Sequence, residues 1–239
     1  MRRLNYRNGQ DIYTYFVDFP EVWVVGENYD PDIPYVCMEY ETIAKIRKNE
    51  NGYFDFSKNI IDIGACHGDY SMLLDFKEQY CFEPNKTTSA LLWTNAYLRE
   101  KTETAHIYNV CLSDINGTVD FNGYCCEGSN SPDETNGIWG EMKPCETKAL
   151  DSYNIKNVGF IKIDVEGFEE KVIRGGLLTI IGNDYPPILF ECWRVGDYNM
   201  TQEKHDSLFN LLRTLGYEIF EYWGDGETHL AVHKPHINN

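Results

Sequence analysis

Short apolar runs alternate with helical patterns from residue 60 onward, and this alternation restricts the fold more than any other feature of the sequence. A short apolar run between polar turns is typical of a buried strand, whereas apolar side chains at 3.6-residue spacing indicate a helix. The order predicts an α/β fold, a mostly parallel sheet with helices on both faces. The predicted strands are 60–63, 79–82, 106–112, 160–163 and 188–190, and the predicted helices are 70–76, 86–101, 168–181 (interrupted at Gly175-Gly176) and 202–215.

The C-terminal part of the sequence predicts one reversed strand. Segments 217–222 and 228–233 flank the sequence Gly-Asp-Gly-Glu at 224–227, which is typical of a hairpin. The last strand is therefore expected to run antiparallel to the others. Ligands of such sheets bind beyond the carboxyl ends of the strands, so we expect the functional residues there.

The length of 239 residues, 42% of them hydrophobic, is enough for one sizeable domain. We expect this domain over 51–239, preceded by an aromatic-rich extension over 1–50 that either caps the sheet or forms part of a substrate wall. The polar stretch 122–147 is predicted to be a loop. Loops beyond about 15 residues are uncommon in compact domains unless they are functional. We interpret this stretch as a substrate loop carrying Trp139, with an insertion of no function as the alternative.

The formal charge of −17 argues against a nucleic-acid partner, because such a field repels phosphate. The basic cluster Arg2, Arg3 and Arg7 is interpreted as a solvated terminus. No apolar run approaches the roughly 18 residues that cross a bilayer, and the first residues do not resemble a signal peptide. The sequence thus predicts a soluble, cytoplasmic protein without a membrane span; the oligomeric state stays open, a homo-oligomer included.

The eight cysteines do not predict a zinc site, because none forms a Cys-x-x-Cys pair. Only Cys125, Cys126 and Cys145 gather in one region. We interpret the cysteines as free thiols in a reducing compartment.

The segment Asp62-Ile63-Gly64-Ala65-Cys66-His67-Gly68 follows the first predicted strand and indicates a nucleotide-type cofactor. Its glycines allow a tight turn into a helix, and Glu83 follows Gly64 by 19 residues at the end of the next strand. An acid at that position accepts hydrogen bonds from ribose hydroxyls. A dinucleotide would require glycine in the middle of the turn, where this chain has Cys66. S-adenosylmethionine has no pyrophosphate, so the turn favours it.

Five segments of this chain resemble the FkbM methyltransferases, over about residues 59–193. They are Asp62-Ile63-Gly64-Ala65 to Gly68, Phe82-Glu83-Pro84-Asn85, Leu112-Ser113-Asp114 with Gly117, Ala149-Leu150-Asp151, and Lys162-Ile163-Asp164-Val165-Glu166-Gly167-Phe168-Glu169. The resemblance implies a Rossmann-like class I methyltransferase fold, a seven-stranded sheet with its last strand antiparallel. It departs from the family at Cys66, where a polar residue is more usual, and neither the N-terminal region nor 122–147 aligns.

The resemblance also implies an activity and a cofactor site. Members of the family look like S-adenosylmethionine-dependent O-methyltransferases acting on hydroxyls of sugars, glycolipids and polyketide-type products. The acceptor expected here is a sugar or glycan, with another small molecule as the alternative. By position, the methionine moiety lies beside Gly64, Ala65 and Gly68, the ribose at Glu83, and the adenine near Asn85 and Ser113. The full expected cofactor set is Asp62, Gly64, Ala65, Cys66, Gly68, Ser71, Glu83, Asn85, Ser113 and Asp164.

Three acids at strand ends are the catalytic candidates: Asp164, Glu166 and Glu191. A neutral hydroxyl is a poor nucleophile, so a base or a metal that acidifies it assists transfer. Acids held together raise one another's pKa, which suits a base, and Asp164 with Glu191 could instead hold Mg²⁺. In the alternatives, Asp164 binds the cofactor's ammonium and Glu166 caps the next helix. His229 is a further candidate base.

Two other functions are compatible with the same fold. One is a protein or nucleic-acid methyltransferase, which the negative charge disfavours. The other is a non-catalytic module that binds the cofactor without turnover. Activity on RNA or peptides would indicate the first, and binding without turnover on hydroxyl compounds would indicate the second.

Overall fold

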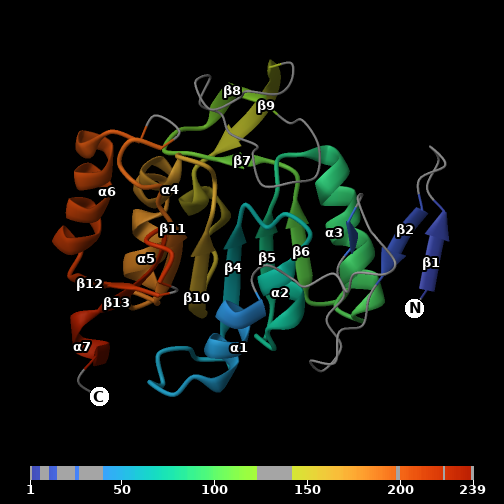
Figure 1. Cartoon of the computed structure of the whole chain (residues 1–239), viewed down its shortest axis with the longest axis horizontal. Helices are drawn as coiled ribbons and strands as arrows, with labels where there is room; N and C mark the ends of the chain where they lie inside the picture. The colour runs from blue at the N-terminus through green and yellow to red at the C-terminus, as the bar shows by residue number, and fades with distance from the viewer. Residues whose placement is uncertain are drawn as a thin grey trace.

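A central seven-stranded sheet organises the molecule in a computed structural model that describes residues 2–5, 11–14, 25–26, 40–122, 142–197, 200–222 and 224–237 (Figure 1). The strand order is β12-β13-β11-β10-β4-β5-β6. Only β13 runs antiparallel to its neighbours in this sheet, as the terminal hairpin predicted. The bounds are β4 Asn59–Ile63, β5 Gln79–Phe82, β6 Ala105–Tyr108, β10 Val158–Ile163, β11 Ile188–Glu191, β12 Tyr217–Glu221 and β13 Thr228–His233.

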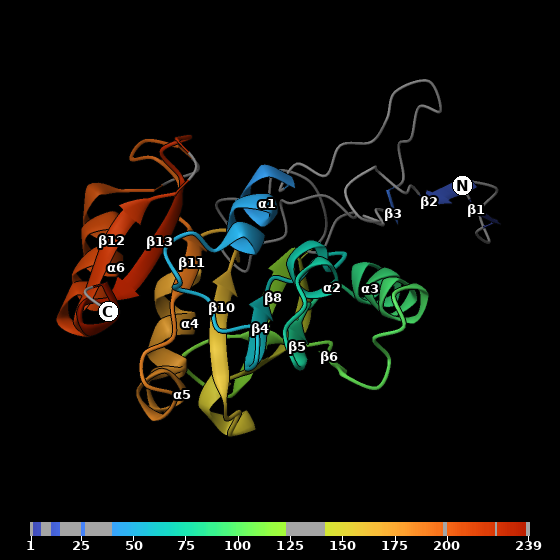
Figure 2. The ribbon, with the colours of Figure 1, turned by 90° about the horizontal axis from the view of Figure 1, so that it is seen from below.

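Helices cover both faces of this sheet, so the α/β class is confirmed (Figure 2). Successive strand residues point to opposite faces. On one face Ile60 and Phe160 pack with Ile43 of α1, and on the other Ile61 and Ile161 pack with residues of α4 and α6. The helices are α1 Tyr40–Lys48, α2 Asp69–Leu73, α3 Lys86–Leu98, α4 Glu169–Gly175, α5 Leu177–Gly182, α6 Gln202–Thr214 and α7 Lys234–Ile237, with a 3-10 turn at Leu150–Tyr153.

Helix α1 was not predicted, although Ile43 and Ile46 are fully buried in the core. It lies inside the segment interpreted as an extension, so residues 42–48 belong to the layer that covers the sheet. The remaining described part of that segment forms three short strands, β1 Arg2–Asn5, β2 Asp11–Thr14 and β3 Val25–Gly26. Within the described ranges, no helix has the length and apolar character that a bilayer crossing requires.

The break between α4 and α5 falls at Gly175-Gly176, as predicted, and the packing explains it. A Cβ on Gly175 would lie 2.0 Å from the carbonyl oxygen of Ser113, and one on Gly176 would lie 2.9 Å from Cδ2 of Leu150. At these two glycines the helices therefore lie closer to Ser113 and Leu150 than a residue with a side chain would allow.

The strand predicted at 106–112 is wrong as a single element. Strand β6 ends at Tyr108, and Cys111–Leu112 form β7, which belongs to a second sheet of order β7-β9-β8. Between them the side chain of Asn109 donates hydrogen bonds to the carbonyl oxygens of Glu83 and Pro84, at 2.8 and 2.9 Å. These bonds turn the chain away from the central sheet.

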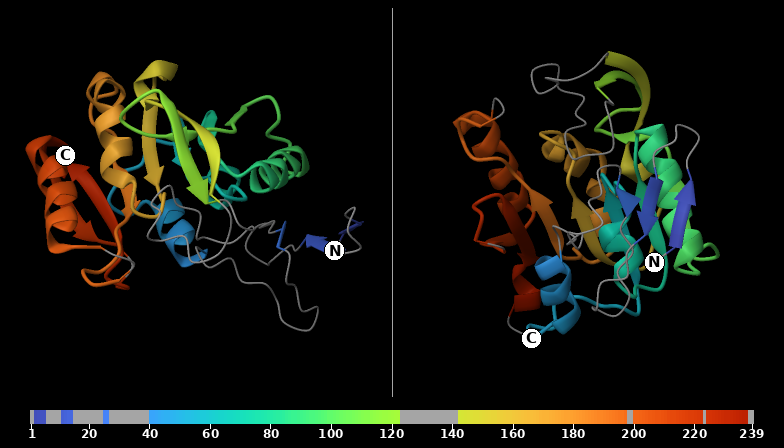
Figure 3. Two further views of the ribbon diagram at one scale, coloured as in Figure 1. Left: turned by 90° about the horizontal axis from the view of Figure 1, so that it is seen from above. Right: turned by 45° about the vertical axis from the view of Figure 1, so that its right-hand side comes forward.

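The loop predicted at 122–147 is also wrong at its ends. Strand β8, Gly117–Asn122, pairs antiparallel with β9, Met142–Lys148. The sequence of β9, Met-Lys-Pro-Cys-Glu-Thr-Lys, lacks apolar alternation and so did not indicate a strand. Cys125, Cys126 and Trp139 lie outside the described residues. The small sheet begins three residues beyond β6 and stands at the carboxyl edge of the central sheet (Figures 1 and 3).

Candidate functional site

The first strand–helix turn is held by the neighbouring strands. The N–H groups of Gly64 and Ala65 donate to the carbonyl of Phe82, at 3.0 and 3.1 Å. Gly64 has φ +69°, and a Cβ there would lie 1.7 Å from the carbonyl oxygen of Asp164. The chain's own packing against the end of β10 therefore requires glycine at 64.

The turn continues through two further left-handed residues. Cys66 has φ +47°, and its N–H donates to Oε2 of Glu83 at 3.0 Å. Burial raises the pKa of the Cys66 thiol well above its usual value, so this side chain is not a thiolate nucleophile. Gly68, with φ +90°, precedes α2, and a Cβ there would lie 2.5 Å from Cδ1 of Leu92. Both predicted glycines are thus explained by packing inside the chain.

Glu83 is buried at the end of β5, and both of its oxygens are hydrogen-bonded. Oε2 accepts from Cys66 and Oε1 accepts from the N–H of Asn85 at 2.8 Å. Burial raises the pKa of Glu83 to about 7, while the two amide donors act in the opposite direction. Each carboxylate oxygen keeps a lone pair after one such bond. The residue can therefore accept hydroxyl donors, as the ribose of S-adenosylmethionine would require.

Several other predicted cofactor residues already have roles within the chain. Asp62 is fully buried and accepts from the N–H of Ser71, itself fully buried, at 3.2 Å. Asn85 caps α3, because its Oδ1 accepts from the N–H groups of Thr87 and Thr88. Ser113 is buried, and its hydroxyl donates to Asp114 at 3.0 Å. Binding of the cofactor by Asp62, Ser71, Asn85 and Ser113 stays a prediction.

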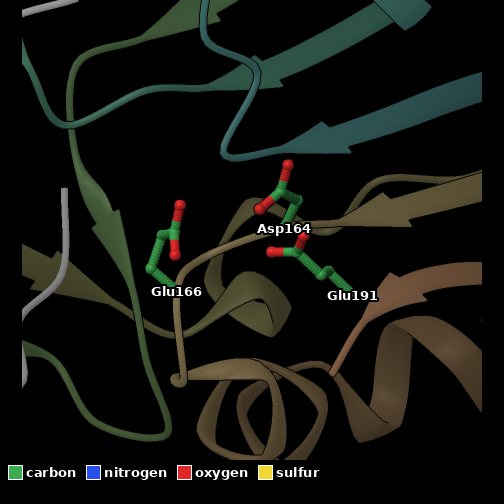
Figure 4. Close-up of side chains that lie close together, drawn as sticks. All are labelled: Asp164, Glu166 and Glu191. Carbon is green, nitrogen blue, oxygen red and sulfur yellow. The ribbon is translucent and has the colours of Figure 1, made fainter. Parts of the chain in front are cut away.

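Asp164, Glu166 and Glu191 come together at the carboxyl edge, as predicted. One oxygen from each lies within 4.8 Å of the other two, and Glu191 points from β11 toward Asp164 (Figure 4). Burial, and then the charge of Asp164, raises the pKa of Glu166 to about 9 and that of Glu191 to about 10. Glu166 has φ +58°, a left-handed conformation that is uncommon for a residue with a side chain. We call these three residues the acid cluster.

Glu169, to which sequence reasoning assigned no role, organises the turn that carries Glu166. Its Oε1 accepts from the N–H of Val165 at 3.3 Å and from the N–H of Gly167 at 3.1 Å. Burial raises the pKa of Glu169 to about 7. The signal that could have indicated it is an acid in the first turn of a helix, where free N–H groups need acceptors.

Lys162 is a second residue of the candidate site to which sequence reasoning assigned no role. It was placed in a strand and in a segment that resembles the family, and its side chain is buried between Asp62 and Asp164. A lysine inside an apolar run could have indicated a buried ion pair, because lysine is almost never fully buried without a partner.

His229 packs away from this chemistry. It stacks on Phe190 at 5.4 Å between ring centroids and contacts Phe209 edge-on at 5.0 Å. Its Nδ1 lies 2.8 Å from the carbonyl oxygen of Glu227, and burial lowers its pKa. These contacts describe a structural histidine better than a base.

The oxygen donors of the acid cluster are of the kind that Mg²⁺ prefers. A cation there would have to displace the protons that the raised pKa values favour on Glu166 and Glu191. The donor set thus fits a divalent cation, as it fits proton transfer.

Comparisons with known proteins identify a family and the fold. Residues 62–219 match the model of the methyltransferase FkbM domain. The fold is similar to that of an FkbM methyltransferase from Methylobacillus flagellatus, with a TM-score of 0.54 and 16% identity over 75% of this chain and 44% of that one. A candidate rRNA methylase from Clostridium thermocellum gives 0.51 and 8% identity, over 84% of this chain and 97% of that one.

An O-methyltransferase from Bacillus cereus, in complex with SAH, gives a TM-score of 0.49 and 12% identity, over 85% of this chain and 84% of that one. No curated protein matches the chain. This chain spans less than half the length of the Methylobacillus protein.

Proposed function

The chain belongs to the FkbM methyltransferase domain family, and from that premise we propose that it transfers a methyl group from S-adenosylmethionine to a hydroxyl of a sugar or glycan. The observation that carries the proposal is the position of the acid cluster beside the cofactor turn. The N–H of Asp164 donates to the carbonyl oxygen of Ile63 at 3.0 Å. The first acid of the cluster therefore lies beside the end of β4, where the cofactor turn starts.

S-adenosylmethionine, when bound, supplies a methyl group on a positively charged sulfur. The chain's part is to hold that group and to take a proton from the acceptor. Glu83 would hold the ribose, because its carboxylate is fixed by two N–H donors and still has lone pairs that can accept hydrogen bonds from the ribose hydroxyls. The backbone of Gly64 to Gly68 would line the rest of the cofactor.

A carboxylate of the acid cluster would accept the hydroxyl proton as the new C–O bond forms. An ordinary glutamate, with a pKa near 4.3, is a weak base toward a hydroxyl. Glu166 and Glu191, whose pKa values are raised to about 9 and 10, are stronger bases once ionised. Turnover should therefore rise with pH up to about 9, and Mg²⁺ bound by the cluster would shift that rise to lower pH.

An acceptor with several hydroxyls suits this site. An ionised carboxylate only accepts hydrogen bonds, and a carboxyl that keeps its proton, as Glu166 and Glu191 do at neutral pH, also donates one. The three acids therefore favour partners whose groups both donate and accept, as hydroxyls do. Sugars present such donors around a ring, and a neutral sugar avoids the repulsion that the formal charge of −17 imposes on phosphorylated acceptors.

Incubation with S-adenosylmethionine carrying a labelled methyl group tests the proposal, with mass spectrometry of a panel of glycans, polyketide-type phenols, peptides and RNA. We expect label on glycan hydroxyls, at a rate lowered by Asp164→Asn and unchanged by Glu218→Gln, an exposed acid of β12. A parallel series with EDTA or added Mg²⁺ measures metal dependence. Label confined to peptides or RNA, or cofactor binding with no turnover on the whole panel, contradicts it.

A further inference from the structure

Lys162 places an ammonium group inside the central sheet, directly between the cofactor turn and the acid cluster. It lies in β10, paired in register with Asp62 of β4, and only 6% of the residue is exposed. Removing an ammonium from water costs several kcal/mol unless the group is paired and hydrogen-bonded. Its contacts therefore indicate what this residue does.

The ammonium contacts both halves of the site. Nζ donates to the carbonyl oxygen of Gly64 at 2.7 Å and lies 3.3 Å from Oδ2 of Asp164. Oδ1 of Asp62 is 3.8 Å away, and the ring of Tyr70 lies under the ammonium with its centroid at 5.5 Å. One group thus contacts the backbone of the turn and a carboxylate of the acid cluster.

The same charge acts on two further acids. Lys162 lowers the pKa values of Glu83 and Glu166, against the larger effect of burial. Glu83 follows β5 on the proposed cofactor side, and Glu166 follows β10 on the acid side. Lys162 is therefore a common electrostatic partner of both.

We propose that Lys162 is a positioning residue that couples the two halves of the site, fixing the carbonyl of Gly64 and the carboxylate of Asp164 in one arrangement. The inference rests on the proposed function, because it assigns the turn to the cofactor and the cluster to the acceptor. When the cofactor occupies the turn, the carbonyl of Gly64 is held, and through Lys162 Asp164 is held with it. Without the ammonium, each half can relax alone.

A double-mutant cycle between Lys162 and Asp164 tests the coupling. The binding of S-adenosylhomocysteine is measured by calorimetry, which needs no acceptor, for the wild type, Lys162→Met, Asp164→Asn and the double variant. We expect Lys162→Met to weaken binding at least tenfold, Asp164→Asn to weaken it about fivefold, and the double variant to bind no more weakly than Lys162→Met. Lys156→Met, an exposed lysine before β10, is the matched control and should bind like the wild type.

A residue that only fills space would give a different result. Additive losses in the double variant, or a wild-type affinity in Lys162→Met, overturn the coupling. Lys162→Gln, whose amide can still donate to Gly64, carries the same expectation if Lys162→Met does not fold, as judged by its melting curve. Lys162→Arg keeps the charge and should recover binding to within about threefold of the wild type.

The binding measurements separate a failure of the coupling from a failure of the proposed function. A wild type that binds no S-adenosylhomocysteine overturns the proposed function itself. A wild type that binds it, with additive variants, overturns only the coupling.

Discussion

Two carboxylates at the carboxyl ends of strands, the buried Glu83 after β5 and the half-buried Glu191 of β11, differ in what surrounds them. Burial raises the pKa of both, but Glu83 accepts two backbone N–H groups and reaches only about 7. At Glu191 the neighbouring Asp164, Glu166 and Glu169 raise the pKa further, to about 10. Backbone donors and neighbouring acids together decide whether a buried acid is a ready acceptor or holds its proton. Such donors preorganise the proposed cofactor side, whereas neighbouring acids suit the acid cluster to the proton exchange proposed for it.

The largest expected effect comes from the point where the two sides touch. Gly64→Ala would place a Cβ 1.7 Å from the carbonyl oxygen of Asp164, so β4 and β10 would have to separate. We expect a loss of about 3 kcal/mol or more in the free energy of unfolding, measured by urea denaturation. Gly52→Ala is the matched control, because Gly52 has φ +68° and nothing within 4 Å of its Cβ position. Equal losses in the two variants would refute the packing explanation.

The next effect should separate turnover from cofactor binding. Asp164→Asn and Glu166→Gln remove acids on the acceptor side, and general-base groups contribute about 10²–10⁴-fold in rate. We expect at least one of them to lower kcat about 100-fold. The Kd for S-adenosylhomocysteine should change less than threefold in Glu166→Gln and by more in Asp164→Asn, whose carboxylate contacts Lys162. Wild-type kcat in both would remove these residues from the mechanism.

The smallest effect concerns stability against pH. The pKa of Glu191 is raised from 4.5 to about 10 in the folded chain, so the folded state binds an extra proton between these values. The contribution of Glu191 to stability is thus complete below pH 4.5 and is lost as the pH rises toward 10. Glu191→Gln removes this loss and should raise the melting temperature at pH 9 by about 2–4 °C, the shift given by about 1 kcal/mol. The gain should disappear at pH 4; a variant that melts below the wild type at pH 9 would contradict it.

Most of the fold could be predicted because the central strands are continuous apolar runs. Strands β4 and β10 are buried along their whole length, and a run of that kind is distinctive. Strand β9 could not be predicted, since its polar sequence shows no apolar alternation and the strand pairs with β7 and β8, segments distant from most of it in the sequence. Helix α1 was not predicted because it has only nine residues, and its two buried isoleucines, Ile43 and Ile46, are too few to show a helical period.

The candidate site divides in the same way. Glu83 and the acid cluster could be predicted, because acids that follow apolar runs must lie at strand ends. Lys162 and Glu169 could not, because their roles arise from partners that lie across the sheet or in a turn whose conformation the sequence does not show. Individual contacts of this kind depend on tertiary structure.

We propose that Glu83 faces the ribose of the cofactor with a carboxylate fixed by the N–H groups of Cys66 and Asn85. Calorimetric titration of S-adenosylmethionine into the wild type and Glu83→Ala tests this placement, with Glu218→Gln as the control. We expect the wild type and the control to bind, and a folded Glu83→Ala to have a Kd at least tenfold higher, because two charge-assisted hydrogen bonds are lost. An unchanged Kd in Glu83→Ala would contradict it.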